Sequence, residues 1–95
     1  MTHYVAIVEE EEGKAFGVWF PDLPCCLSAG DTLDEALANA GEALALCVDV
    51  ARERDTPIPA ARSLTELKKD AAVADEMRAY MVALIALDPR RLEAA

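Results

Sequence analysis

Residues 16–37 read FGVWFPDLPCCLSAGDTLDEAL and are the most informative stretch of this 95-residue chain. The stretch opens with aromatic and β-branched residues, which predicts a strand over residues 15–20. Pro21 ends that strand, because proline has no N–H to donate to a neighbouring strand. Pro24 fixes the turn that follows, and a short third strand is predicted over residues 25–29.

The second half of the stretch predicts the start of a long helix. Gly30 closes the short strand, and Thr32 is a favoured N-cap residue. Glu35 stands three positions after Thr32, which is the spacing of a capping box. Apolar residues then recur at helical spacing, and we therefore predict a helix over residues 33–54.

The residues before this stretch predict a hairpin. Residues 3–9 are rich in β-formers and read as a first strand, and the acidic run Glu9–Glu12 with the glycine after it reads as a turn into the strand at 15–20. Alternation gives both faces of this hairpin apolar residues. We expect a helix to cover one face and another element or another subunit to cover the other.

The last third of the chain is expected to return to the sheet. Helical composition runs over residues 63–78, with a possible break near Asp70. Residues 79–87 form a continuous apolar run that we interpret as a fourth strand, and residues 90–95 as a tail or one helical turn. The order β-β-β-α-(α)-β predicts an α+β two-layer sandwich with an antiparallel sheet, in a single domain over residues 1–95.

The net charge of −9 is concentrated in one part of the chain. Residues 1–60 hold three basic residues against twelve acidic ones, whereas residues 61–95 hold six of each. Such a chain should not bind DNA or RNA directly, since that binding rests on Lys and Arg displacing counterions from phosphates. An acidic surface can instead steer a basic protein partner towards it, although the same charge also serves solubility alone.

The cysteine and histidine content predicts no bound metal or cofactor. Three cysteines, two of them adjacent, make neither a disulfide framework nor a zinc set, and His3 is the only histidine. No secretory leader and no apolar run of membrane length is recognisable, so the expected location is the cytoplasm.

The motif Phe20-Pro-Asp-Leu-Pro24 followed by Gly30-Asp-Thr-Leu-Asp-Glu-Ala36 resembles the signature of HicB-type antitoxins, the neutralising halves of bacterial HicA/HicB toxin–antitoxin pairs. The likeness extends over about residues 3–87. It implies a partial ribonuclease H-like fold in which the motif positions are mainly structural. The positions that we assign to the fold on this basis are Pro21, Pro24, Gly30, Thr32 and Glu35.

The resemblance also implies a function by occlusion. HicA-type toxins are small basic proteins that cleave mRNA, and an acidic antitoxin can cover their surface. We expect the partner contacts at Glu9, Glu10, Glu11, Glu12, Trp19, Asp22 and Leu23. Many family members carry a C-terminal DNA-binding domain, whereas this sequence ends at Ala95, so we expect a short form. Exposed sheet edges also predict a homo-oligomer, a dimer or higher, with the strand at 79–87 as the contact.

We do not expect an enzyme. Metal-dependent nuclease chemistry would need converging carboxylates, and the candidates Glu9, Asp22, Asp31 and Glu35 each have a structural explanation in a turn or a helix cap. Two other readings stay open. The chain could be an orphan HicB-like oligomeric scaffold or regulator without a toxin, or a small-molecule-binding domain, which a polar concave pocket would reveal.

Overall fold

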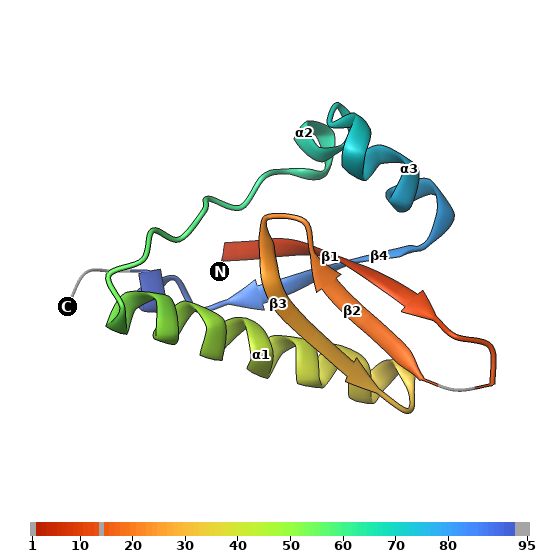
Figure 1. Cartoon of the computed structure of the whole chain (residues 1–95), viewed down its shortest axis with the longest axis horizontal. Helices are drawn as coiled ribbons and strands as arrows, with labels where there is room; N and C mark the ends of the chain where they lie inside the picture. Colours follow the sequence, from red (N-terminus) through yellow and green to blue (C-terminus); the bar gives the residue numbers. More distant parts are fainter. Residues whose placement is uncertain (1, 14, 93–95) are drawn as a thin grey trace.

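A computed structural model describes residues 2–13 and 15–92 and shows one four-stranded antiparallel sheet packed against helices (Figure 1). The predicted α+β class with an antiparallel sheet is confirmed. The strands are β1 (Thr2–Glu10), β2 (Phe16–Phe20), β3 (Leu23–Gly30) and β4 (Met81–Leu87). The helices are α1 (Leu33–Glu53), α2 (Leu64–Lys68), α3 (Ala71–Ala79) and the short 3-10 helix η1 (Pro89–Leu92).

The strands lie in the order β3-β2-β1-β4, so the first and the last strand of the chain are neighbours. β1 and β2 form a hairpin whose register runs from Ile7 opposite Trp19 to Glu10 opposite Phe16. β4 pairs with β1 along its whole length. β1 is therefore a central strand, and β3 and β4 are the two edges.

α1 covers one face of the sheet and forms the larger core with it. The side chains of β1 and β2 that point to this face alternate with those that point away, as the sequence predicted. Tyr4 also anchors the segment that leaves α1, because its hydroxyl donates a hydrogen bond to the carbonyl of Pro59 at 2.7 Å. The buried residues of this core are Tyr4, Ala6, Val8, Val18, Phe20, Cys26, Ala36, Ala40, Leu44, Val48, Ile85 and Leu87.

The connection from β3 to α1 depends on Gly30. A Cβ atom on Gly30 would lie 2.4 Å from the backbone nitrogen of Ala36, in the first turn of α1. Thr32 then caps the helix, with its Oγ1 accepting a hydrogen bond from the backbone N–H of Glu35 at 3.1 Å. The absence of a side chain at Gly30 thus lets β3 and α1 approach closely.

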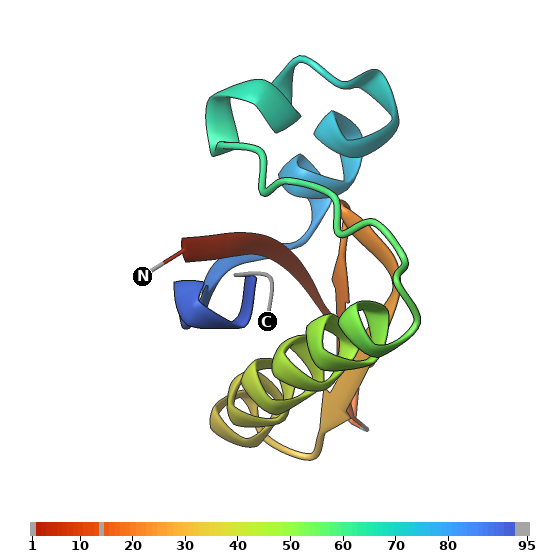
Figure 2. The ribbon, with the colours of Figure 1, turned by 90° about the vertical axis from the view of Figure 1, so that its left-hand side faces the viewer.

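The opposite face of the sheet is covered in part by α2 and α3, which lie on the other side of the sheet from α1 (Figure 2). Leu67 and Val73 bury Val5 and Ile7 in a second, smaller core. From the sequence we expected another element or another subunit to cover this face. The structure shows that α2 and α3 of the same chain cover part of it.

Several boundaries differ from those predicted. β3 begins at Leu23, so Pro24 lies inside an edge strand, a position where its missing N–H is tolerated. The helical region breaks after α2 because the Asp70 side chain accepts a hydrogen bond from the N–H of Ala72 at 3.0 Å and starts a new helix. That helix runs to Ala79, which delays the fourth strand by two residues.

The two remaining differences concern helix ends. α1 ends at Glu53, with Arg54 as its C-cap. The predicted terminal turn corresponds to η1, while residues 93–95 lie outside the described part. No helix in residues 2–13 and 15–92 is both long enough and apolar enough to cross a membrane.

Candidate partner-binding surface

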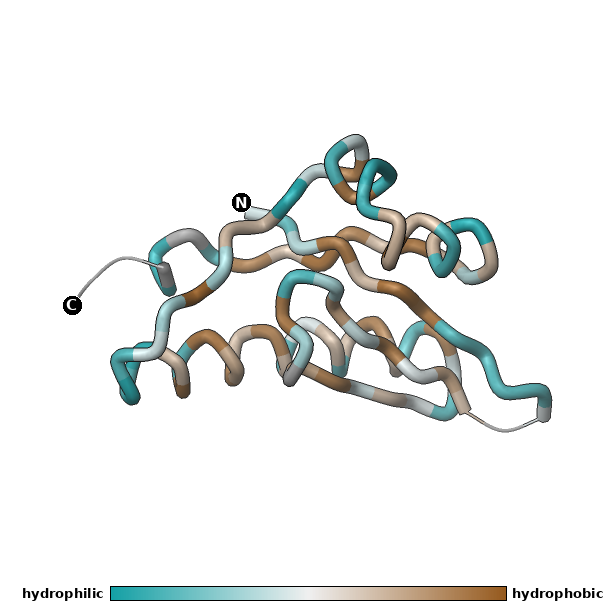
Figure 3. Tube along the Cα trace, turned by 45° about the horizontal axis from the view of Figure 1, so that its top comes forward, coloured by the Kyte–Doolittle hydropathy of each residue, from teal (hydrophilic) through white to brown (hydrophobic). Residues whose placement is uncertain are grey.

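The β1–β2 turn carries the most concentrated negative charge of the described structure. The backbone N–H of Glu11 donates to the carbonyl of Ala15 at 3.0 Å, which closes the turn. Gly13 has a φ of +72°, a left-handed conformation that glycine adopts without strain. Glu10, Glu11 and Glu12 are exposed, and the turn forms a hydrophilic tip at the end of two largely apolar strands (Figure 3).

Glu9 and Trp19 are joined by a side-chain hydrogen bond at the base of this turn. The indole Nε1–H of Trp19 donates a hydrogen bond to Oε2 of Glu9 at 2.7 Å. The Trp19 ring is half-buried and packs against the smaller core. One edge of the ring is therefore fixed by the core and the other by a charge-assisted hydrogen bond, which pre-organises the side chain.

A hollow of 360 Å³ lies over this pair. Leu27, which stands opposite Trp19 in the β2–β3 register, forms part of its wall and is 68% exposed. The hollow thus combines carboxylates, an indole and an aliphatic side chain. This combination suits a Lys or Arg side chain, whose charge the carboxylates attract and whose methylene stem packs on apolar groups. The lining residues are Glu9, Glu11, Gly17, Val18, Trp19, Leu27 and Ser28.

We use the term hairpin surface for six residues at this end of the sheet, which are Trp19 and Leu27 with the turn glutamates Glu9, Glu10, Glu11 and Glu12. Tyr80 adjoins this surface, since it lines a neighbouring hollow together with Glu10 and Phe16. The negative charges of Glu9 and then of Glu76 raise the pKa of its hydroxyl. The sequence analysis did not single out Leu27 or Tyr80. Strand alternation from Trp19 would have found Leu27 only with the β2–β3 register known.

The structure does not bring Asp22 and Leu23 to the hairpin surface. The Asp22 side chain is only 6% exposed and is held by Arg62, whose backbone N–H and Nε donate at 2.8 Å and 2.6 Å. Leu23 is half-buried and packs against the larger core. Both residues therefore serve the fold in this structure, and their contact with a partner stays a prediction.

The remaining residues assigned to the fold are found at turns and caps. Pro21 lies in the turn between β2 and β3. Glu35 does not complete a strict capping box, since its Oε1 accepts from the N–H of Asp31 at 3.4 Å and not from that of Thr32. The Ser63–Glu66 pair at the start of α2 does form a complete box. At α1 the contact of the Glu35 side chain with the backbone is thus made one residue earlier, at Asp31 and not at Thr32.

The four carboxylates weighed for metal chemistry are not assembled into a ligand set. Within residues 2–13 and 15–92, no three His, Cys, Asp or Glu side chains come together as metal ligands. Glu9 is engaged with Trp19, Asp22 with Arg62 and Glu35 with the Asp31 backbone. The described geometry instead offers an acidic, partly apolar surface, which is a feature of proteins that bind other proteins.

Comparison with known proteins shows to which family this chain belongs. The sequence model for the "HicB_like antitoxin of bacterial toxin-antitoxin system" matches residues 4–95. The chain belongs to this family. It is 37% identical to Antitoxin HicB 2 of Photorhabdus laumondii over 76 residues, which cover 78% of this chain and 53% of the relative.

A second relative comes from a bacteriophage. The chain is 39% identical over 59 residues to an uncharacterized 14.9 kDa protein in the rep-hol intergenic region of Haemophilus phage HP1, covering 62% of this chain and 43% of that protein. The chain thus spans about half the length of the curated relatives it matches.

Solved structures show the same fold. The antitoxin HicB of Burkholderia pseudomallei superposes with a TM-score of 0.78 at 26% identity, covering 100% of this chain and 70% of that one. Its N-terminal domain alone gives 0.74 at 26% identity, covering 92% and 99%. A structure of the HicA3 and HicB3 toxin–antitoxin complex gives 0.73 at 22% identity, covering 93% and 100%.

Proposed function

We propose that this protein is an antitoxin that binds a basic HicA-type, mRNA-cleaving toxin in the cytoplasm and covers its RNA-binding surface. The observation that carries the proposal is the hairpin surface, where Glu9 fixes the Trp19 indole beside an exposed leucine and three exposed glutamates lie in the adjoining turn. Family membership supports the antitoxin role, and one structural neighbour is a toxin–antitoxin complex. The protein acts here by binding and not by catalysis.

The physical argument divides the hairpin surface into two parts. Exposed carboxylates at Glu10, Glu11 and Glu12 raise the rate of encounter with a basic partner and add little to affinity by themselves, because solvent screens them. Trp19 and Leu27 offer the apolar anchor that a stable contact needs at its centre. The exposed glutamates should therefore set the association rate and its salt dependence, and the anchors the dissociation rate.

The test is binding to a HicA-type toxin made catalytically inactive, measured by surface plasmon resonance at low and high salt. Replacement of Glu10, Glu11 and Glu12 by Gln should lower the association rate about tenfold at low salt and flatten its salt dependence. Leu27→Lys should raise the dissociation rate. A matched control is Asp34→Asn with Glu42→Gln and Glu53→Gln, which removes the same charge from exposed positions of α1.

Two outcomes would contradict the proposal. Equal effects of the hairpin and α1 triple variants would show that only net charge matters. No binding to any HicA-type toxin at low salt, together with no protection of cells that express the toxin, would favour the orphan scaffold or regulator.

A further inference from the structure

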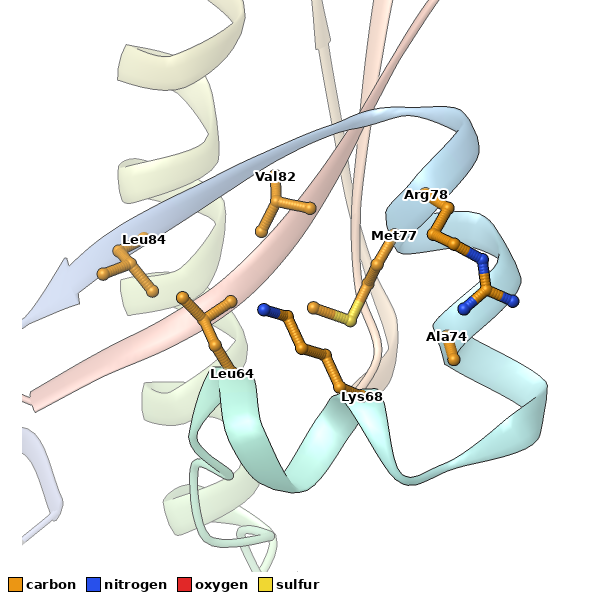
Figure 4. A pocket seen from close by; sticks show the side chains of 7 residues that line it. All are labelled: Leu64, Lys68, Ala74, Met77, Arg78, Val82 and Leu84. Atoms are coloured by element: carbon orange, nitrogen blue, oxygen red, sulfur yellow. The ribbon is translucent and has the colours of Figure 1, made fainter.

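A groove lies on the sheet face that α2 and α3 only partly cover. It has a volume of 640 Å³ and is bordered by α2, α3 and β4 (Figure 4). This volume falls within the range of about 300–1,000 Å³ that is usual for the sites of small organic ligands. Most of the lining is apolar and comes from Leu64, Ala74, Met77, Val82 and Leu84.

The apolar lining continues the smaller core outwards. Val82 and Leu84 stand opposite Ile7 and Val5 in the β1–β4 register, so they point to the same face as these core residues. Val82 is only partly buried, and Leu84 is 55% exposed. A ligand that covered them would remove apolar surface from water, which favours binding.

Two basic side chains accompany this apolar lining. In Figure 4 the side chain of Lys68 points towards the apolar side chains of the groove, whereas the guanidinium of Arg78 lies at one end of the group. Arg78 is paired with the carboxylate of Asp75. Lys68 makes no ion pair with any residue in 2–13 and 15–92. The groove therefore offers one unmatched positive charge beside an apolar surface.

We propose that this groove binds a small amphiphilic carboxylate, a molecule with one negative charge and an aliphatic tail. The ammonium group of Lys68 holds the carboxylate, and the tail lies against Leu64, Met77 and the exposed face of β4. A carboxylate leaves water at lower cost when a cation faces it. The stem of Lys68 can pack on the same tail while its charged end reaches the carboxylate.

Other occupants fit these features less well. A basic protein, as proposed for the hairpin surface, would bring further cations to Lys68 and Arg78. Nucleic acid is held by several Lys and Arg side chains on its phosphates and gains little from an aliphatic lining. The contact between copies that the sequence predicts at residues 79–87 would use the edge of β4, whereas the groove opens on its face.

The test is isothermal titration calorimetry of the whole chain with decanoate, octanoate and decanol, each kept below the concentration at which it aggregates. Decanoate should bind one site per chain. Octanoate should bind roughly tenfold more weakly, because each methylene that enters the groove lowers the dissociation constant by up to about fourfold. Decanol has the same tail without the charge and should bind roughly fivefold more weakly.

Matched variants separate the charge from the apolar lining. Lys68→Gln should weaken decanoate binding roughly fivefold and leave decanol binding unchanged. Lys69→Gln is its control, since it removes the same charge from an adjacent exposed residue outside the lining. Leu84→Gln should weaken both probes, with Leu46→Gln on α1 as its control, because Leu46 is similarly exposed at 65%. Circular dichroism checks each fold, and Lys68→Gln alone decides the matter if Leu84→Gln unfolds.

Amide chemical shifts locate the bound probe independently of mutation. Decanoate should shift the amides of α2, α3 and β4 and leave those of α1 in place. Four results would overturn the proposal, namely no binding at millimolar decanoate, shifts outside α2, α3 and β4, equal effects of Lys68→Gln and Lys69→Gln, or decanoate binding that disappears as the chain self-associates. Toxin binding does not depend on this groove, so Lys68→Gln should leave it unchanged.

Discussion

Arg62 donates two hydrogen bonds to the carboxylate of Asp22, which lies forty residues earlier in the chain. The backbone N–H of Arg62 donates to Oδ2 at 2.8 Å, and its Nε donates to Oδ1 at 2.6 Å. The same guanidinium donates to Asp70 at 3.0 Å, at the start of α3. One side chain therefore ties the β2–β3 turn to both short helices that cover the second sheet face.

We expect Asp22→Ala to lower the free energy of unfolding by about 2 kcal/mol. The Asp22 carboxylate is nearly buried, so its removal leaves the backbone N–H of Arg62 without an acceptor. The partial exposure of the Arg62 guanidinium limits the loss of stability. Asp22→Asn should cost less because it keeps an acceptor oxygen. Urea denaturation measures both, with Glu42→Gln on exposed α1 as the control. A loss no larger than that of the control would contradict a structural role for Asp22.

Gly30 and Gly41 should respond in opposite ways to alanine. A Cβ at Gly30 meets the α1 backbone at 2.4 Å, so Gly30→Ala must shift the helix and should destabilise by roughly 1–3 kcal/mol or more. Gly41 lies within α1 with nothing within 4 Å of its Cβ position, so Gly41→Ala should stabilise by about 0.5–1 kcal/mol. Thermal melts of the two variants test this directly, and equal signs would refute it.

Acid should weaken the fold through Asp88. Hydrogen bonds from the Arg90 side chain and then from its backbone N–H lower the pKa of Asp88 to about 2. The unfolded chain therefore binds more protons than the folded chain as the pH falls below about 4, and the stabilisation is lost as the pH approaches 2. Asp88→Asn should lower the melting temperature at neutral pH and reduce its drop between these two pH values.

Asp70→Asn should reduce the drop in the same way, because hydrogen bonds from the Arg62 side chain and from the Ala72 N–H lower the pKa of Asp70. Asp31→Asn is the control for both variants, since Asp31 is exposed and makes no ion pair within the described residues. If Asp88→Asn and Asp70→Asn show the same drop as Asp31→Asn and the wild type, the arginine contacts do not hold in solution.

Cys26 should be inert in the folded protein. Burial, and next the hydrogen bond with the thiol of Cys47, raise the pKa of Cys26 to about 12. At pH 8 it should react with iodoacetamide at least about a hundredfold more slowly than in urea, because only the thiolate is nucleophilic. A Cys25→Ser background lets mass spectrometry assign the label, with half-buried Cys47 as the internal comparison. Equal rates in native and unfolded protein would contradict this packing.

The helices and strands were predicted well where capping residues and hydrophobic periodicity give a clear signal. The helical stripe after Thr32 predicted α1 to within one residue, and alternation in residues 3–9 and 15–20 assigned both sheet faces. The same local reading gave Asp22 a role in partner binding. Its true environment depends on Arg62, which lies forty residues away and carries no local signal.

Weak or competing signals account for the other differences. Helical composition continues across Asp70, but the side chain of Asp70 makes a better cap than a helix interior, and this splits the region into α2 and α3. The sequence assigned the acidic turn and Trp19 to the expected partner contact, which stays a prediction. Leu27 and Tyr80 join it only through the sheet register and the path of α3 into β4, which single-residue properties do not encode.

The position of β1 has a consequence for the order in which the chain folds. β1 is made first, yet one of its two neighbours, β4, is among the last segments to be synthesised. Until β4 has left the ribosome, Val5 and Ile7 lack their partners on that strand, Leu84 and Val82. The sheet therefore closes only after translation of nearly the whole described chain, and a stalled or truncated product would present an open apolar edge to chaperones and proteases.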